Sequence, residues 1–300
     1  MGALLSSLRD GKGFDILLVM FAMVFLLALS GAPLIYNVVM SFQEVDIFSL
    51  GTFSRPFVGL KNYQAVFADP TTMPILWNTI LFVVFSIAGQ FVLGFSLALF
   101  FTVNFPASSY LRGLFLASWV MPGLVVGAIW NWILSGDFGV LNYALSSVGI
   151  IENNIFWRSD IHFSLWAVII ANIWLGTAFN MILLSVGLAG IPRDIYEAAE
   201  LDGANAFQRF YTITLPMMRA TIGAVISLGL IFTLQQFDLF AAITAGGPNN
   251  SSNVLQYKAW ELSFKEYDFA RGATISVLMI IVVFIASILY VRSTRAEVRQ

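Results

Sequence analysis

The chain has 300 residues, of which 59% are hydrophobic and 11% are charged, and its net charge is −2. A soluble globular domain carries about 25% charged residues. This composition therefore excludes a soluble protein and indicates a membrane protein. The sequence has no Cys and a single His, His162. These counts exclude a disulfide framework, a thiolate metal site, a cysteine nucleophile and the multi-histidine metal sites of membrane enzymes. We therefore expect no metal site. The net charge points to no particular partner, and we expect no nucleic acid.

Six segments are largely free of charged residues and are long enough to cross a bilayer, which takes about 20 apolar residues. We expect spans at about residues 16–38, 75–101, 113–134, 163–188, 218–241 and 271–292. The first follows Arg9 and Lys12 as a signal peptide would. Its apolar run exceeds the roughly 7–15 residues of such a peptide, so we expect an uncleaved span. The predicted fold class is an all-α membrane protein with six transmembrane helices.

The six spans leave little room for a separate soluble domain, and the sequence shows no soluble linker, low-complexity tract or internal repeat. We expect one membrane domain at residues 15–292, which includes a polar loop at 190–217 between the fourth and fifth spans. Short tails at residues 1–14 and 293–300 flank this domain.

Lys and Arg are distributed unequally over the predicted topology, and an excess of them marks the cytoplasmic side. One side carries nine, namely Arg9, Lys12, Arg112, Arg193, Arg209, Arg219, Arg292, Arg295 and Arg299. The other carries six, namely Arg55, Lys61, Arg158, Lys258, Lys265 and Arg271. We therefore expect both termini and the 193–219 segment to face the cytoplasm.

The polar loop holds the most informative pattern in the chain. Pro192 suits the first position of a helix. The helix that follows has small and acidic residues on its surface, namely Asp194, Glu197, Ala198, Ala199, Glu200 and Asp202. Small side chains allow another backbone to approach, and carboxylates can pair with Arg or Lys of a docked protein. An amphipathic helix on the inner leaflet is the alternative, but such helices are usually rich in Lys and Arg.

The end of this helix and the start of the next are also predicted. Gly203 should stop the first helix in a left-handed conformation. Asn205 and Gln208 have the spacing of a capping box, so a second helix should begin there. Leu215-Pro216 should close this second helix at the membrane. We therefore expect residues 190–217 to form two short helices on which another protein docks, and we call this segment the elbow.

The elbow resembles the EAA loop of the membrane subunits of bacterial ABC importers. The pattern Glu197-Ala198-Ala199-x3-Gly203-x9-Ile213-x-Leu215-Pro216 matches that motif without departure. More narrowly, the chain resembles the sugar-permease group related to the maltose-importer membrane subunit, through residues 57–63, 137–142, 172–176 and 244–248. These four stretches are weak individually, whereas the EAA pattern is strongly diagnostic.

The resemblance implies a permease subunit of a bacterial inner (plasma) membrane that forms half of an import pathway for a sugar or oligosaccharide. Its partners would be a second homologous permease subunit, two copies of a cytoplasmic ABC ATPase, an extracytoplasmic sugar-binding protein and membrane lipid. Contact with the ATPase is implied for Glu197, Ala198, Ala199, Glu200, Asp202 and Gly203. Connection of that contact to the fifth span is implied for Ile213, Leu215 and Pro216.

The chain itself encodes no nucleotide site. A phosphate-binding loop needs Gly-x4-Gly-Lys-Ser/Thr. The one Gly-Lys pair, Gly11-Lys12, is followed by Gly13 and has Ser6 in the position of the first Gly. We expect no cofactor bound by this chain, no catalytic residue, and ATP and Mg bound by the partner ATPase subunits.

A sugar pathway needs amides or hydroxyls for hydrogen bonds and aromatic faces for the C–H side of the ring. Asn172, Gly176 and Asn180 share one face of the fourth span, and Gly229, Thr233 and Gln236 share one face of the fifth. The resemblance implies substrate contact for Asn172, Leu175, Gly176, Thr233 and Gln236. The maltose subunit is rich in Asn where this chain has Thr233, Gln235 and Gln236, so the sugar can differ.

Three alternatives remain open. The amides could instead bond between helices, worth about 0.6–2 kcal/mol each. Asp238 could be an intramembrane carboxylate and hence a proton or ion site; since it lies about 28 Å from Arg219 on an uninterrupted helix, we expect it instead at the outer interface in a solvated or structural role. An ATP-independent secondary transporter of a small polar solute is the rival function, although the spans show neither ionisable relays nor repeated broken helices. Arg and Lys occur at the ends of the expected spans but not in their interiors, so an anionic substrate would need neutralisation by the partner chain.

Overall fold

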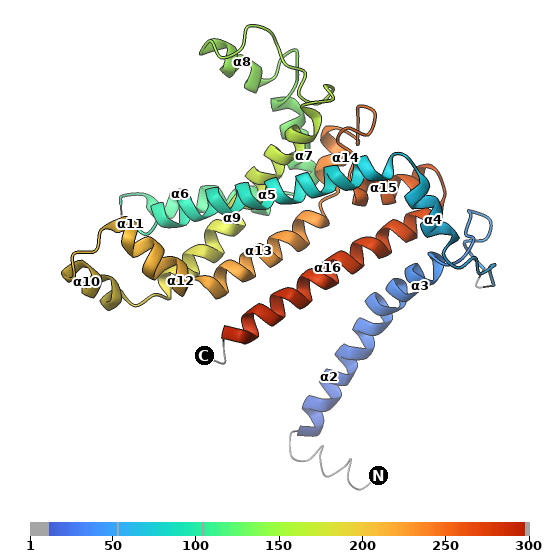
Figure 1. The fold of residues 1–300 in the computed structure, drawn as a ribbon, viewed down its shortest axis with the longest axis horizontal. Coiled ribbons are helices and arrows are strands. Elements are labelled where there is room, and N and C mark those ends of the chain that lie inside the picture. The colour runs from blue at the N-terminus through green and yellow to red at the C-terminus, as the bar shows by residue number, and fades with distance from the viewer. Residues whose placement is uncertain (1–11, 53, 104, 298–300) are drawn as a thin grey trace. The chain divides into compact units, whose positions relative to one another are not determined.

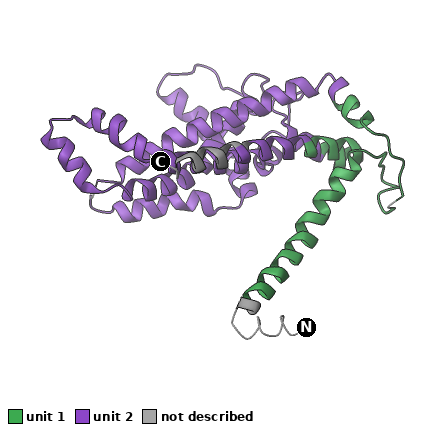
Figure 2. Ribbon diagram, turned by 60° about the horizontal axis from the view of Figure 1, so that its bottom comes forward, with its two compact units in different colours: residues 1–66, 261–277 green, residues 67–260, 278–300 purple. Residues whose placement is uncertain are grey.

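The computed structural model describes residues 12–52, 54–103 and 105–297, and their regular structure is helical apart from one isolated bridge between Gln43 and Phe57. The expectations for Ser6, Arg9, Gly11 and Arg299 lie outside the described residues. The chain forms two compact units, residues 1–66 with 261–277 and residues 67–260 with 278–300 (Figure 2). The all-α membrane fold is confirmed by this architecture and by the solved structures described below. The boundaries of the membrane domain and its tails stay predictions.

The first unit contains the first predicted span. Three consecutive pieces form it, α2 (Lys12–Leu26), the π-helical η1 (Leu27–Gly31) and α3 (Ala32–Met40). Residues Asp15–Met40 are long and apolar enough to cross a membrane. The π-helical turn ends two residues before Pro33, which has no N–H to donate and so disturbs the regular hydrogen-bond ladder. The π-helical η3 (Glu261–Lys265) also belongs to this unit, as do the first residues of α4 (Lys61–Ala68) and α16 (Phe269–Glu297).

The second unit is built around α5 (Thr72–Phe100), α9 (Ser164–Ala189) and α13 (Arg219–Leu234), which lie side by side (Figure 1). Its other elements are α6 (Ser108–Val120), α7 (Gly123–Ile133), α8 (Val140–Ser147), α10 (Arg193–Leu201), α11 (Ala206–Arg209), η2 (Phe210–Thr214), α12 (Leu215–Met217), α14 (Asp238–Ile243) and α15 (Leu255–Trp260). Phe82 of α5 and Phe240 of α14, both fully buried, meet edge to face at 4.8 Å and centre one apolar core. A second core, around Leu184 and Met218, lies next to the elbow.

Three described helices are long and apolar enough to cross a membrane, or up to five if each of two bent pairs counts as one span. The described apolar part of α16 is shorter, at Phe269–Ile285. The expected unbroken span 113–134 is wrong, because α6 and α7 meet at an angle of 100°. Pro122 causes this break. It is extended and excludes the helical conformation from Met121, whose ψ is 138°.

The expected unbroken span 218–241 is also wrong. Helix α13 ends at Leu234, and α14 begins separately at Asp238. No Pro or Gly lies between them; side chains from elsewhere satisfy the backbone instead. Gln256 donates from Nε2 to the carbonyl oxygen of Gln236, within the break, at 2.7 Å. Asn131 donates from Nδ2 to the carbonyl oxygen of Ala242, in the last turn of α14, at 2.6 Å. The first bond satisfies a backbone carbonyl that a continuous helix would have paired, and the second satisfies one at the end of α14.

Candidate functional site

One cavity of the second unit brings together all five residues for which substrate contact is expected. Its volume is about 300 Å³. Asn172, Leu175 and Gly176 come from α9, Thr233 from α13, and Gln236 from the break after α13. The remaining lining residues are Gln90, Trp119, Met121, Gly123, Phe179, Asn180, Gly229, Phe232, Gln235 and Asp238.

Asn172 is held in place while its own amide stays free. Its side chain is only 4% exposed, and Nδ2 has no hydrogen-bond partner. Its backbone carbonyl accepts a hydrogen bond of 2.9 Å from Nε2 of Gln90 on α5. Leaving a buried amide unpaired costs about 1–3 kcal/mol. A donor in this condition is suited to a hydroxyl of a ligand that enters the cavity.

The alternative of amides bonded between helices applies to one residue of the cavity. Gln90 does join α5 to α9 in this way, whereas Asn180 donates from Nδ2 to the carbonyl oxygen of Gly176 in its own helix at 2.9 Å. Gly176 leaves the space through which Gln90 passes. A Cβ on this glycine would lie 2.3 Å from Cδ of Gln90. An amide in the middle of the long apolar run of α5 was the signal that could have identified Gln90.

Aromatic rings form part of the cavity wall. Phe179 lies between Trp119 and Phe232, with ring centroids 5.4 Å from each. Trp119 and Phe232 are about half exposed in this chain. The cavity thus combines amide donors and acceptors with apolar faces, which is the composition of small-molecule sites. These rings were not identified from the sequence, because aromatic residues are common throughout the spans.

Asp238 also lines the cavity. The distance of about 28 Å from Arg219 assumed an uninterrupted helix, and the break after Leu234 removes that assumption. Asp238 is half-buried and begins α14. It therefore stands among the amides and rings of the cavity.

The elbow has the predicted two-helix form, with small differences at its ends. Pro192 lies one position before the helix rather than at its first residue, because α10 begins at Arg193. Gly203 has a φ of +81°, which confirms the left-handed stop. The capping box is confirmed, since Asn205 and Gln208 exchange hydrogen bonds of 2.8 and 2.9 Å. The second helix, α11 to α12, runs one residue past Pro216 and then bends by 69° into α13.

The residues of the EAA pattern differ in exposure. Glu197, Ala198, Glu200, Asp202 and Gly203 are exposed, and Ala199 is half-buried. Ile213, Leu215 and Pro216 are half-buried, and Leu215 packs against the core beside Met218. Five of the six residues expected to contact the ATPase are therefore exposed, and the three expected to connect this contact to the fifth span are half-buried; both roles stay predictions.

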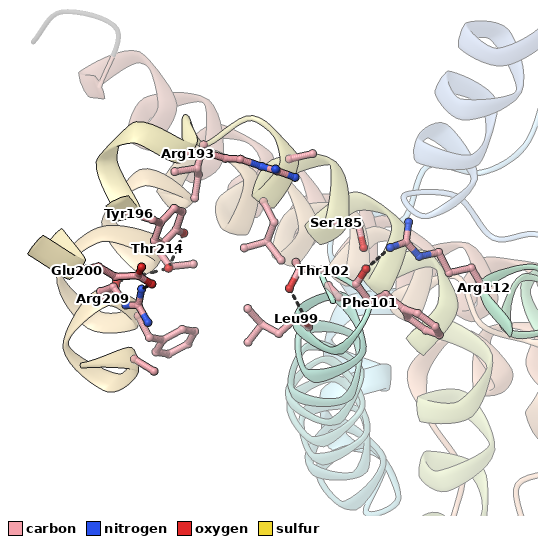
Figure 3. Close-up of a pocket in the computed structure, with 16 residues that line it drawn as sticks. Leu99, Phe101, Thr102, Arg112, Ser185, Arg193, Tyr196, Glu200, Arg209 and Thr214 are labelled. Atoms are coloured by element: carbon pink, nitrogen blue, oxygen red, sulfur yellow. Dashed lines mark hydrogen bonds and ion pairs between the residues drawn. The ribbon is translucent and has the colours of Figure 1, made fainter. Parts of the chain in front are cut away.

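Two interactions tie α10 to the second helix of the elbow. The hydroxyls of Tyr196 and Thr214 lie 2.8 Å apart, and Glu200 forms an ion pair with Arg209 (Figure 3). Glu200, one of the residues for which contact with the ATPase is expected, is therefore paired within the elbow. Glu197 has no hydrogen bond or ion pair within the described part of the chain.

A second and larger cavity of about 860 Å³ lies between the elbow and the ends of α5 and α9. Three arginines, Arg112, Arg193 and Arg209, line it together with Glu200 (Figure 3). Arg112 donates to the carbonyl oxygen of Phe101 and lies over the ring of that residue. The elbow therefore faces a basic hollow on one side and presents the small and acidic residues of α10 to solvent.

The sequence is similar to those of known transport permeases. The trehalose/maltose transport system permease protein MalF of Thermococcus litoralis is 32% identical over 80% of this chain and 81% of that protein. The sulfoquinovosyl glycerol transport system permease protein SmoG of Agrobacterium fabrum is 30% identical over 80% of this chain and 78% of that protein. A probable ABC transporter permease protein of Brucella suis is 29% identical over 88% of this chain and 94% of that protein.

Solved structures share the fold. A bacterial alginate ABC transporter in complex with an alginate pentasaccharide-bound periplasmic protein gives a TM-score of 0.81 at 18% identity, over 97% of this chain and 96% of that chain. A bacterial ABC transporter involved in import of the acidic polysaccharide alginate gives a TM-score of 0.78 at 21% identity, over 97% and 99%. The family model of the binding-protein-dependent transport system inner membrane component matches residues 90–296. The chain belongs to this family of membrane permeases.

Proposed function

We propose that this chain is the permease subunit of an ATP-binding-cassette importer and forms half of the pathway for a sugar or oligosaccharide. The observation that carries the proposal is one cavity lined by Asn172, whose Nδ2 is unpaired, together with Gln236, Thr233 and aromatic rings. Sugars present hydroxyls on their rims and C–H groups on their faces, so they complement both parts of this lining. The relatives whose names give a substrate transport trehalose or maltose, or sulfoquinovosyl glycerol.

The proposed partners follow from the family. An extracytoplasmic binding protein would deliver the sugar, a second homologous permease subunit would form the other half of the pathway, and two copies of a cytoplasmic ATPase would bind ATP and Mg. This chain would then carry no catalytic site and no cofactor of its own. Both termini and the elbow would face the cytoplasm, which places α10 where an ATPase can reach it.

The elbow has the connections that coupling requires. Helix α9 is separated from α10 by Gly190–Pro192 alone, and α12 is separated from α13 by the single residue Met218, which is fully buried. Helices α9 and α13 both line the cavity. An ATPase that moved α10 on closure would therefore move two walls of the sugar site. Alternating access by this route is the proposed mechanism.

The test is ATP hydrolysis coupled to transport, measured for the co-expressed complex in proteoliposomes with the loaded binding protein and a panel of mono- and oligosaccharides. Stimulation by one sugar, accompanied by its uptake, supports the proposal and identifies the substrate. If no second permease or ATPase co-purifies and uptake proceeds without ATP, an ATP-independent carrier replaces it.

A further inference from the structure

The cavity of about 300 Å³ that contains Asn172 has one acidic side chain in its lining. Among the described residues, those that line the cavity include one carboxylate, Asp238, and no Lys, Arg or His. The other polar side chains of the lining are neutral, namely the amides of Gln90, Asn172, Asn180, Gln235 and Gln236, the hydroxyl of Thr233 and the indole N–H of Trp119. The lining that this chain contributes to the cavity therefore has one acidic side chain and no basic one.

The carboxylate is held against a neighbouring helix without being neutralised. Asp238 begins α14, and Gly123 begins α7. A Cβ on Gly123 would lie 2.5 Å from Oδ2 of Asp238, so the absence of a side chain there leaves room for the carboxylate. Within the described part of the chain, the carboxylate of Asp238 has no hydrogen bond and no ion pair. The start of α7 offers it only the partial positive charge of a helix end.

A half-buried carboxylate without an ion-pair partner discriminates between ligands by their charge. It accepts hydrogen bonds from sugar hydroxyls and attracts an ammonium group. It repels a carboxylate, sulfonate or phosphate, and the repulsion is stronger there than in bulk water. Specificity achieved by a repulsive group is as effective as specificity achieved by an additional attractive contact.

We propose that Asp238 restricts the pathway to neutral saccharides, with tolerance for amino sugars, and rejects sugar acids. This inference rests on the proposed function as a sugar permease. A structural role is the competing explanation, in which the carboxylate only completes the start of α7. The two explanations differ in outcome, because a structural role affects every ligand equally whereas a charge filter affects anionic ligands alone.

The experiment measures equilibrium binding to the purified permease–ATPase complex without binding protein, so that the selectivity of the binding protein does not enter. The probes are neutral gluco-oligosaccharides of increasing length and the same compounds oxidised to the uronic acid at one C6. We expect the wild-type complex to bind the neutral member of each pair at least about tenfold more tightly. Asp238→Asn, which keeps the shape of the side chain, should remove most of this preference.

Two further variants complete the design. Asp137→Asn removes an exposed carboxylate outside the cavity and should leave the preference unchanged. Gln235→Lys adds a cation to the lining while keeping Asp238, and it should admit the acids even if Asp238→Asn fails to assemble.

Equal wild-type binding of neutral and acidic probes would overturn the inference but leave the proposed function as a sugar permease intact. An equal loss of both probes in Asp238→Asn would assign the residue a structural role. Wild-type binding of no saccharide at all would instead contradict the proposed function.

Discussion

Gln90 donates a hydrogen bond of 2.9 Å from its side-chain Nε2 to the backbone carbonyl of Asn172, and both residues are almost fully buried. This bond joins α5 to α9 in the wall of the cavity and uses the backbone of Asn172 rather than its side chain. It therefore separates structural and ligand-binding roles within one pair of residues. The first two predictions test this separation.

Gly176→Ala should displace Gln90 and weaken the joint between α5 and α9. The added Cβ would lie 2.3 Å from Cδ of Gln90, which forces the amide away from Asn172. Overpacking of this kind costs about 1–3 kcal/mol. A lower melting temperature of the purified complex, together with weaker sugar binding, checks the prediction. Gly113→Ala is the matched control, because no atom lies within 4 Å of its added Cβ; a similar loss there would mean that the helix itself, not the contact, is sensitive.

Asn172→Ala should weaken sugar binding about tenfold and leave stability nearly unchanged, because its Nδ2 has no partner in the structure. For replacement of Asn142 we expect the opposite pattern, a loss of stability with unchanged sugar affinity. Its Nδ2 donates to the carbonyl oxygens of Gly136 and Ile155 at 2.9 Å each, and its Oδ1 accepts from Trp157 at 2.8 Å.

Asn142→Ala should therefore cost about 1–3 kcal/mol of stability, because its buried partners lose their hydrogen bonds, without a direct effect on sugar affinity. Thermal unfolding and equilibrium sugar binding of both variants separate the two outcomes. A large stability loss in Asn172→Ala with unchanged affinity would show that Asn172 serves the fold and not the ligand.

Glu197→Ala and Gly203→Asp should each uncouple ATP hydrolysis from transport. Glu197 is exposed and forms no bond within the described residues, so its removal leaves the elbow folded and affects only what docks there. Gly203 has a φ of +81°, and a side chain at that position strains the end of α10. The measurement is sugar-stimulated hydrolysis and uptake by the reconstituted complex. Glu152→Ala, which removes another exposed carboxylate, should have no effect; uptake unchanged in both elbow variants would exclude the elbow from coupling.

Glu200 and Arg209 should show a small mutual interaction in a double-mutant cycle. The side chain of Glu200 is 59% exposed and that of Arg209 is 23% exposed, so water screens the ion pair. Exposed pairs contribute about 0.2–1 kcal/mol. Glu200→Gln, Arg209→Gln and the double variant should therefore differ little in melting temperature, and the double variant should be no worse than either single one. If the losses of melting temperature in the two single variants instead added up in the double variant, each residue would act separately, and the pair would have no shared role in fixing α10.

The elbow was predictable because each of its features is local. Gly203, Asn205 and Gln208 determine a stop and a start through bonds within a few residues, and the structure has both. The break at Pro122 also has a local cause, since the residue before a proline avoids the helical conformation. It was missed because apolar residues continue on both sides of the break and obscure it.

The break between α13 and α14 was not predictable in the same way. It involves Gln256, which lies 20 residues further along the chain and donates to the backbone carbonyl of Gln236 within the break. Asp238 was consequently given a position on a helix that does not continue, and its membership of the cavity was missed. Asn172 and Thr233 were placed correctly relative to the cavity because each lies inside an uninterrupted helix, where spacing determines the face.

The short connections on either side of the elbow make it continuous with the walls of the cavity. Three residues precede α10 and one buried residue, Met218, follows α12, so no slack segment can absorb a displacement. A compound that wedged α9 away from α13 would consequently immobilise the elbow from inside the pathway. Such a compound would inhibit ATP hydrolysis by the partner ATPase without occupying the ATP site or the surface on which the ATPase docks. Its potency would depend on the shape of the cavity alone.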